Sequence, residues 1–447
     1  MLELQLILAI LTGVIVLLTL IIRLKLNAFL SLLISAIWVG ILGGLSPNEI
    51  IDSISTGMGN TLAFVATIIG LGAIFGAFLE HSGGAHALAI FLLKKGGETR
   101  SRLALLITGF IVAIPVFFDV GLIILLPIVT ALSQKSGKHI LHFALPLITG
   151  LAVTHSFIPP TPGPVAVAKI LQVDLGYAIL IGAAIGLPIA IICGLYLSQL
   201  ITPIKSGLIK QDVEINFEYD SRLIKAIFLV LGLPLLLILS GSLFNTLSTE
   251  GLINEAKWIE ILAFLGHPFI ALIIATLMAL LYLGKKRGLS NKELFEVSNK
   301  SLAPAGSIIL ITGAGGVLKT MMINTGIGDM IGEAMAQSSF SVVLLAYLVA
   351  SLVRIMQGSA TVAMLTAAGI VAAVIPDLNL GMVDKTLIMM AIAAGSIIAS
   401  HVNDSGFWLV NRYLEQSVQE SIKSWTIQST MISVSSFLLI FIIYQLL

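Results

Sequence analysis

Polar side chains gather where prolines and a glycine interrupt a long apolar segment, residues 140–173. The interruption carries Thr154, His155, Ser156, Thr161 and Gly163 among four prolines that fall between positions 159 and 164. Each proline lacks an N–H and clashes with the preceding turn, so this segment cannot continue as one helix. Unwound backbone is tolerated at membrane depth only where it is buried in protein or lines a watery cavity. A broken helix with hydroxyls and an imidazole at the break is typical of a transporter's solute site.

Three further stretches place polar groups inside apolar segments. Residues 386–413 hold a second polar interruption, and the apolar stretches 103–132 and 342–374 are each broken near the middle. An ionisable side chain inside a membrane segment is costly and usually faces a cavity or a partner. We therefore expect these stretches to form the binding site. The candidate substrate-binding residues are Asp119, Gly121, Thr154, His155, Ser156, Thr161, Gly163, Gln357, Gly358, Ser359, Thr361, His401, Asn403, Asp404 and Ser405.

The composition identifies the broad class of protein. Of 447 residues, 57% are hydrophobic and only 11% are charged, whereas soluble proteins carry roughly 25% charged residues. The chain is therefore predicted to be an all-α polytopic membrane protein. A net charge of +1 gives no reason to expect a nucleic-acid partner, and the single Cys193 excludes an internal disulfide. We find no nucleotide loop, metal-ligand cluster or catalytic triad, so we expect no cofactor, no metal and no enzymatic activity.

The distribution of basic residues predicts the topology. Basic residues flank the stretch 103–132 on both sides, with Lys95 and Arg102 before it and Lys135 and Lys138 after it. Because basic residues favour the cytoplasmic side, this stretch is predicted to be a hairpin that enters and leaves from the cytoplasm. About ten full spans remain, with both termini outside. These spans are residues 6–22, 28–45, 61–79, 140–173, 177–200, 226–243, 259–283, 301–322, 386–413 and 425–447.

An internal repeat divides the chain into two halves. Gly70-Leu71-Gly72 matches Gly313-Ala314-Gly315, and Gly163 matches Gly406, each pair 243 residues apart. Between these matches, each half contains a hairpin tip and then a broken helix. We expect a first repeat at 1–203, with hairpin 103–132 and broken helix 140–173, and a cytoplasmic linker at 204–223. The second repeat, 224–447, has hairpin 342–374 and broken helix 386–413. Counting spans makes the second hairpin enter from outside, so the repeats are predicted to be inverted.

At these residues the sequence resembles the gluconate permease (gluconate:proton symporter) family of the ion-transporter superfamily, over essentially the whole chain. The resemblance rests on long motifs: residues 80–85 (Glu-His-Ser-Gly-Gly-Ala), 115–121 (Pro-Val-Phe-Phe-Asp-Val-Gly), 154–160, 357–363 and 400–408. It implies secondary active uptake of gluconate or a related sugar acid by proton symport, with D-serine carriers among the relatives. It also implies the bacterial inner membrane, two inverted repeats and a homodimer.

Two positions depart from the pattern of that family. Many relatives have Glu where this chain has Asp119, and His is common where this chain has Thr161. Both differences fall inside expected binding segments. They leave the exact sugar acid and the charge of the pocket open.

The expected mechanism couples an anion to a cation. Free amide N–H groups at the helix breaks can receive a carboxylate, and nearby hydroxyls and amides can receive the substrate hydroxyls. Because burial favours the neutral form of a carboxyl group, Asp119 or Asp404 could bind the coupled proton, with His155 as a further candidate. Arg354 is either the partner of a carboxylate or a residue that extends to the membrane surface. Sodium coupling, a D-serine-type amino-acid symporter, a passive channel and an intramembrane enzyme are the alternatives.

Overall fold

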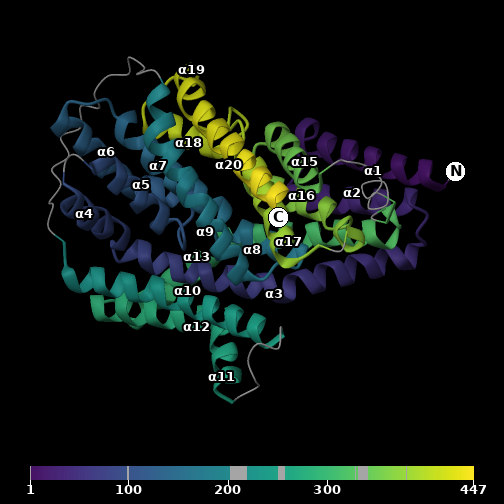
Figure 1. The fold of residues 1–447 in the computed structure, drawn as a ribbon, viewed down its shortest axis with the longest axis horizontal. Helices are drawn as coiled ribbons and strands as arrows, with labels where there is room; N and C mark the ends of the chain where they lie inside the picture. Colours follow the sequence, from purple (N-terminus) through teal and green to yellow (C-terminus); the bar gives the residue numbers. More distant parts are fainter. Residues whose placement is uncertain are drawn as a thin grey trace.

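The computed structural model describes residues 2–97, 100–201, 219–249, 257–327, 329–330, 341–378 and 380–447. Every regular element in these ranges is helical (Figure 1). Most of the expected linker 204–223 lies outside the described residues. The linker therefore stays a prediction.

The helices follow one another along the chain with short connections. They are α1 (Leu2–Leu18), α2 (Ala28–Leu42), α3 (Pro47–His81), α4 (Gly84–Gly96), α5 (Ser101–Val112), α6 (Phe118–Ser136), α7 (Leu141–Phe157), α8 (Pro162–Leu171), α9 (Leu175–Ile191), α10 (Ser221–Thr249), α11 (Lys257–Gly266), α12 (Pro268–Ala279), α13 (Asn291–Asn324), α15 (Val342–Gln357), α16 (Ala360–Val371), α17 (Met382–Ile397), α18 (Ser405–Tyr413), α19 (Val418–Ser421) and α20 (Ile427–Leu446). Short π or 3₁₀ turns extend α1, α9 and α12 and join α19 to α20.

Within the described ranges, nine helical segments are long and apolar enough to cross a membrane. This confirms the predicted all-α polytopic membrane protein. The boundaries differ in places from those expected. The predicted span 259–283 is two helices, α11 and α12, because His267 caps a new helix whose first residue is Pro268. Helix α6, expected as a hairpin arm, has 19 residues and is itself long enough to cross.

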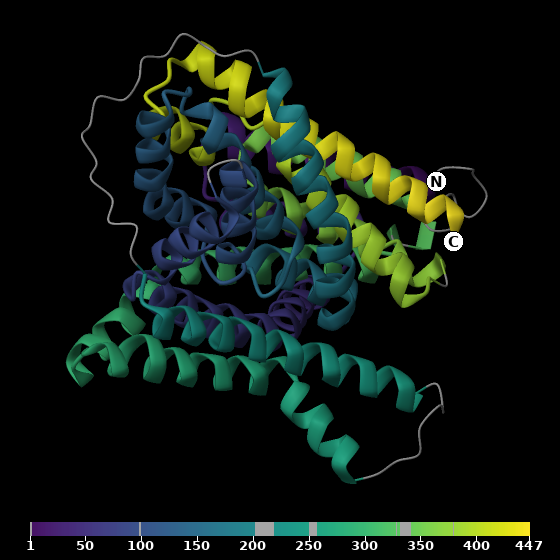
Figure 2. The same cartoon turned by 60° about the vertical axis from the view of Figure 1, so that its left-hand side comes forward.

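Two long helices, α3 and α13, pack along each other. Each starts at a capping box: the side chains of Ser46 and Glu49, and of Ser290 and Glu293, bond to each other's backbone N–H groups. These caps extend α3 well before the predicted start at residue 61. A Cβ at Gly57 would lie 2.7 Å from the backbone oxygen of Gly316, so this contact requires small residues. In both views α10 and α12 lie alongside α3 as an outer layer (Figures 1 and 2).

The two halves of the chain repeat the same order of helices. The pair α5–α6 is followed by the interrupted helix α7–α8, and the pair α15–α16 is followed by α17–α18. Helices α8 and α18 begin at Pro162 and Ser405, and the segments after them begin at Leu175 and Val418. The starts of α8 and α18 are therefore 243 residues apart, and so are the starts of the two segments that follow them. This is the offset found in the sequence.

Glycines bring the first arm of each pair close to the following interrupted helix. A Cβ at Gly150 of α7 would lie 2.2 Å from the backbone oxygen of Leu106 in α5. A Cβ at Gly395 of α17 would lie 2.6 Å from the backbone oxygen of Tyr347 in α15. The backbones therefore approach more closely than larger side chains allow. This packing holds each tip beside a helix break.

Candidate functional site

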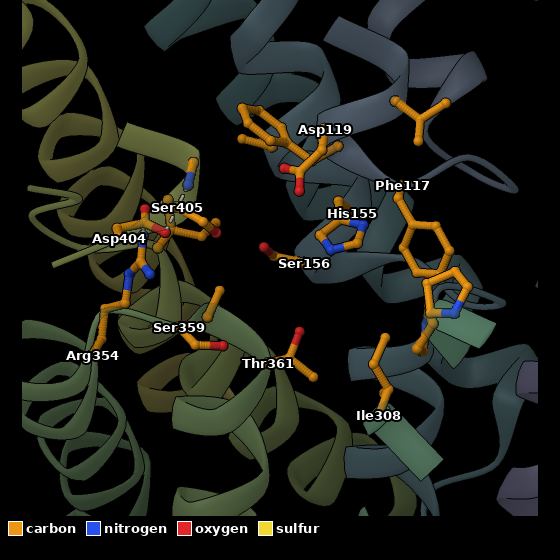
Figure 3. Close-up of a pocket in the computed structure, with 18 of the residues that line it drawn as sticks. Phe117, Asp119, His155, Ser156, Ile308, Arg354, Ser359, Thr361, Asp404 and Ser405 are labelled. Atoms are coloured by element: carbon orange, nitrogen blue, oxygen red, sulfur yellow. Dashed lines mark hydrogen bonds and ion pairs between the residues drawn. The ribbon is translucent and has the colours of Figure 1, made fainter. Parts of the chain in front are cut away.

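Four helices begin at the wall of one central cavity of about 360 Å³. They are α6, α8, α16 and α18, whose first residues, Phe118, Pro162, Ala360 and Ser405, all line it (Figure 3). The first turn of a helix has N–H groups without helical acceptors and carries a partial positive charge. Four such ends around one cavity favour a bound anion.

The four helix ends differ in the donors that they offer. In α6 the first helical bond is donated by the Gly121 N–H, so the N–H groups before it remain available. In α8, Pro162 and Pro164 have no N–H, which leaves Gly163 as the donor of that turn. In α18 the Gly406 N–H already donates to the Asp404 carboxylate at 3.0 Å. The helix ends therefore offer the cavity different numbers of free N–H donors, although the helices themselves repeat.

A buried ion pair forms one wall of the cavity. The Arg354 guanidinium donates to the Asp404 carboxylate and to the Gly358 carbonyl. The two charged side chains are 5% and 9% exposed. Asp404 also accepts from the Ser400 hydroxyl, which in turn accepts from the Trp425 indole at 2.7 Å. The pair is thus held by a network, which resolves the two alternatives for Arg354 in favour of a carboxylate partner.

The opposite wall carries polar groups that face the cavity without a protein partner. Figure 3 shows the Asp119 carboxyl and the Ser156 hydroxyl directed into the cavity beside His155. Among the described residues, neither Asp119 nor Ser156 has a side-chain hydrogen bond or ion pair, and the buried Nδ1 of His155 also has none. Thr361 lines the cavity from α16. These groups remain available to a polar solute.

Aromatic rings close the space between the polar walls. Phe118 stacks on Trp425 with ring centroids 5.7 Å apart, and Phe117 meets the His155 ring edge-on at 6.2 Å. Pro304 and Ile308 of α13 complete the apolar part of the lining. An apolar enclosure with a few convergent polar groups is typical of a small-molecule site.

The structure brings seven of the predicted site residues to the cavity wall. They are Asp119, His155, Ser156, Ser359, Thr361, Asp404 and Ser405. The other eight do not line it; seven of them support the breaks and tips through close packing or hydrogen bonds, whereas the buried Thr154 hydroxyl has no hydrogen-bond partner among the described residues. The eight are Gly121, Thr154, Thr161, Gly163, Gln357, Gly358, His401 and Asn403.

Close backbone contact explains several of these supporting positions. Gly358 has φ +91° and a Cβ there would lie 2.2 Å from the Asn403 backbone oxygen, so the second tip fits directly against the second break. The Asn403 amide donates to the Ile355 carbonyl at 2.8 Å across the same contact. Gly121 and Gly163 instead pack against side chains, because a Cβ at these positions would lie 2.7 Å from Leu151 Cδ2 and 2.8 Å from Met364 Sδ. These glycines permit the cavity to form.

Sequence reasoning missed the aromatic and α13 residues of the lining. Phe118, Trp425 and Ile308 belong to helices far apart in sequence, and an apolar residue in an apolar helix gives no signal of its own. Phe117 and Phe118 lie directly before Asp119, so their place at a tip was the one signal that could have found them. In the described residues no group of three or more His, Cys, Asp or Glu side chains could hold a metal ion.

Ser359 offers a test of the cavity wall. Its hydroxyl caps α16 by accepting from the Val362 N–H at 3.4 Å, and the residue lines the cavity. Replacing Ser359 with Leu should reduce solute affinity at least about tenfold by filling the cavity, and removing the cap should cost about 1 kcal/mol. The matched control is Ser417→Leu, which removes an exposed cap outside the cavity. Radioligand binding to purified protein decides, and equal affinity in both variants would contradict the assignment.

The fold resembles that of a solved transporter structure. The YdaH transporter of Alcanivorax borkumensis, described as having an unusual topology, superposes with a TM-score of 0.63 over 90% of each chain. Sequence identity is 16%, so this likeness concerns the fold alone.

Curated relatives are much more similar in sequence. A gluconate permease of Pseudomonas aeruginosa is 37% identical over 94% of this chain and 93% of its own. The low-affinity gluconate transporter of Escherichia coli is 33% identical over the full length of both, and its Gnt-II system L-idonate transporter is 35% identical over 95% and 96%. The sequence profile of GntP family permeases matches residues 5–447. This chain is therefore a transporter, not an enzyme, and belongs to the GntP permease family.

Proposed function

We propose that this protein imports gluconate or a closely related sugar acid together with a proton. The observation that carries the proposal is the convergence of four helix N-termini on one cavity of about 360 Å³. This cavity falls within the range of small-molecule sites, about 300–1,000 Å³. The relatives are named for gluconate and L-idonate, which are six-carbon acids with one carboxylate and several hydroxyls. Helix ends suit the carboxylate, and Ser156, Ser359 and Thr361 suit the hydroxyls.

The charges around the cavity support coupling to a proton. Asp404 is neutralised by Arg354, whereas Asp119 faces the cavity without a cation among the described residues. A substrate carboxylate would add a second negative charge to the same enclosed space. Two like charges at short range disfavour full ionisation of both, so anion binding favours protonation of Asp119. Substrate and proton then enter together, and the loaded cavity gains no net charge.

Transport by reconstituted protein tests this function. Proteoliposomes with an acidic exterior and sodium-free buffers should accumulate radiolabelled gluconate above its outside concentration. Accumulation that requires a sodium gradient instead would replace the proton with sodium. Equilibration without accumulation would indicate a passive channel. A screen of four- to six-carbon aldonic acids, with D-serine included, would then identify the preferred substrate.

The membrane orientation is part of the same proposal. We infer that the ends of α4 and α6 face the cytoplasm, because Lys94 and Lys95 end α4 and Lys135 ends α6. Both termini are then outside, and Figure 2 places them toward the same end of the molecule. The bacterial inner membrane and the homodimer implied by the resemblance stay predictions.

Cysteine labelling checks the orientation. The variants Lys95→Cys and Lys138→Cys should both react with a membrane-impermeant maleimide only after the membrane is opened, since both sites lie at cytoplasmic ends. Cys193 is fully buried, so the natural chain provides an unreactive background. Labelling of the two cysteines from opposite sides would exclude the hairpin at 103–132 and the inverted repeat.

A further inference from the structure

A second cavity of about 310 Å³ adjoins the central one. It lies where α3 ends and α13 begins, and is lined by Ala77, Glu80 and His81 of α3 and by Lys300 and Ser301 of α13, with the first hairpin tip on its inner side. We call it the vestibule. Glu80, His81 and Lys300 are exposed, so the vestibule opens to solvent.

The vestibule and the central cavity share part of their walls. Phe117, Val120 and Pro304 line both. Phe117 stands at the tip, immediately before the first residue of α6, and its ring lies edge-on to His155 at 6.2 Å. Figure 3 shows this ring at the edge of the central cavity, beyond His155. Phe117, with Val120 and Pro304, thus lies between the proposed binding site and an opening to solvent.

Small residues and a proline shape this boundary. A Cβ at Gly76 would lie 2.1 Å from the Pro115 carbonyl oxygen, so the tip lies directly on α3. Pro304 has no N–H to donate to the carbonyl four residues earlier, which belongs to Lys300. That carbonyl lacks its helical donor at a residue that lines the vestibule.

The charged side chains of the vestibule favour passage of an anion over its tight binding. Lys300 and Glu80 carry opposite charges, and His81 is the other titratable group of the lining. With His81 neutral, the vestibule has no net charge, so an anion is neither repelled nor held. A passage must let its solute leave again, whereas the central cavity supplies the helix ends that bind it.

We propose that the vestibule is the route by which the sugar acid passes between the central cavity and one side of the membrane. The Phe117 side chain lies between the two cavities on this route. This inference rests on the proposed function. The region where α3 ends and α13 begins then has a role in permeation. The passage is separate from the binding site.

A bulky group placed in the vestibule tests the route. Ala77→Cys is labelled with fluorescein maleimide in purified protein, which is then reconstituted. Gluconate uptake should slow at least tenfold, while gluconate affinity in detergent stays within threefold, because the central cavity is untouched. Lys292→Cys, which is exposed two turns before Lys300 on α13, is the matched control and should transport normally when labelled.

The other outcomes overturn the proposal. Normal uptake by labelled Ala77→Cys would mean that the solute does not pass the vestibule. Loss of affinity together with uptake would mean that no separate passage exists, and equal slowing in labelled Lys292→Cys would mean a general block. If unlabelled protein neither binds nor transports any sugar acid, the proposed function fails instead, which is a distinguishable result.

Variants that change the charge of the vestibule provide an independent test, because removing a positive or a negative charge should shift the KM in opposite directions. Lys300→Gln leaves Glu80 as the net charge and should raise the KM for gluconate supplied on the vestibule's side of the membrane about threefold or more at low salt. Glu80→Gln leaves Lys300 and should lower the KM, and Lys292→Gln should change it little. Affinity in detergent should be the same in all three. Shifts of the same sign in the first two variants, or no shift in either, would overturn the role of the vestibule.

Discussion

Asp119→Asn should abolish accumulation of sugar acid driven by a pH gradient while exchange at equal concentrations continues. The amide keeps the shape of the carboxyl group but cannot take up or release a proton. With one proton per monoanion, the parent protein should accumulate substrate about tenfold per unit of pH difference. The variant should only equilibrate. Asp119 lines the cavity and has no side-chain partner among the described residues, so the substitution breaks no hydrogen bond or ion pair with them.

Asp384→Asn is the matched control. Asp384 accepts from the Gly381 N–H at 3.0 Å at the start of α17, outside the cavity. It should lose some stability and keep coupled accumulation. If Asp119→Asn still accumulates substrate with a proton gradient alone, the proton binds elsewhere. Asp404 and His155 are then the next candidates, with His401 after them.

Arg354→Gln should be the most damaging single substitution in the cavity. It leaves the Asp404 carboxylate buried without its counter-ion, and removal of one partner of a buried pair costs about 3–5 kcal/mol. The double variant Arg354→Gln with Asp404→Asn removes both charges and should recover most of the thermal stability. Its gluconate affinity should still fall about 10–100-fold, because a charge-assisted hydrogen bond contributes about 1.5–3 kcal/mol.

An exposed pair provides the comparison. Arg287 and Asp220 lie 2.6 Å apart with side chains 39% and 41% exposed, and such surface pairs contribute little. Arg287→Gln should therefore change neither stability nor binding much. Thermal unfolding and radioligand binding on purified variants give both quantities. Wild-type affinity in the Arg354/Asp404 double variant would show that the pair is purely structural.

The sequence predicted the breaks and tips because their chemistry is local. Four prolines between positions 159 and 164 end α7, and Gly358 with φ +91° turns the chain between α15 and α16. Polar residues at such points have few local partners, so several of them line the cavity, as Ser156 and Ser359 do. The internal repeat could also be found in the sequence. Matching segments of the two halves have the same total length, which keeps the offset constant.

Other features depend on contacts between distant segments. Arg354 meets a carboxylate fifty positions later, and sequence alone does not distinguish this from an arginine that reaches the membrane surface. A glycine such as Gly121 or Gly163 can leave space either for a ligand or for a neighbouring helix. The structure places both glycines against side chains. The split of residues 259–283 depended on His267 accepting from the Phe269 N–H, a cap that the hydrophobic pattern hides.

The unequal donors of the repeated helix ends bear on stereochemistry. The first turn of α8 offers only the Gly163 N–H, while Arg354 stands on the wall formed by the other half of the chain. A flexible chain with a carboxylate at one end should therefore prefer one direction in the cavity. Each carbon along it should then meet its own set of neighbours, and the mirror-image molecule should present its hydroxyls to a different set. If the proposed function holds, we therefore expect a scaffold built from two similar halves to distinguish a sugar acid from its mirror image.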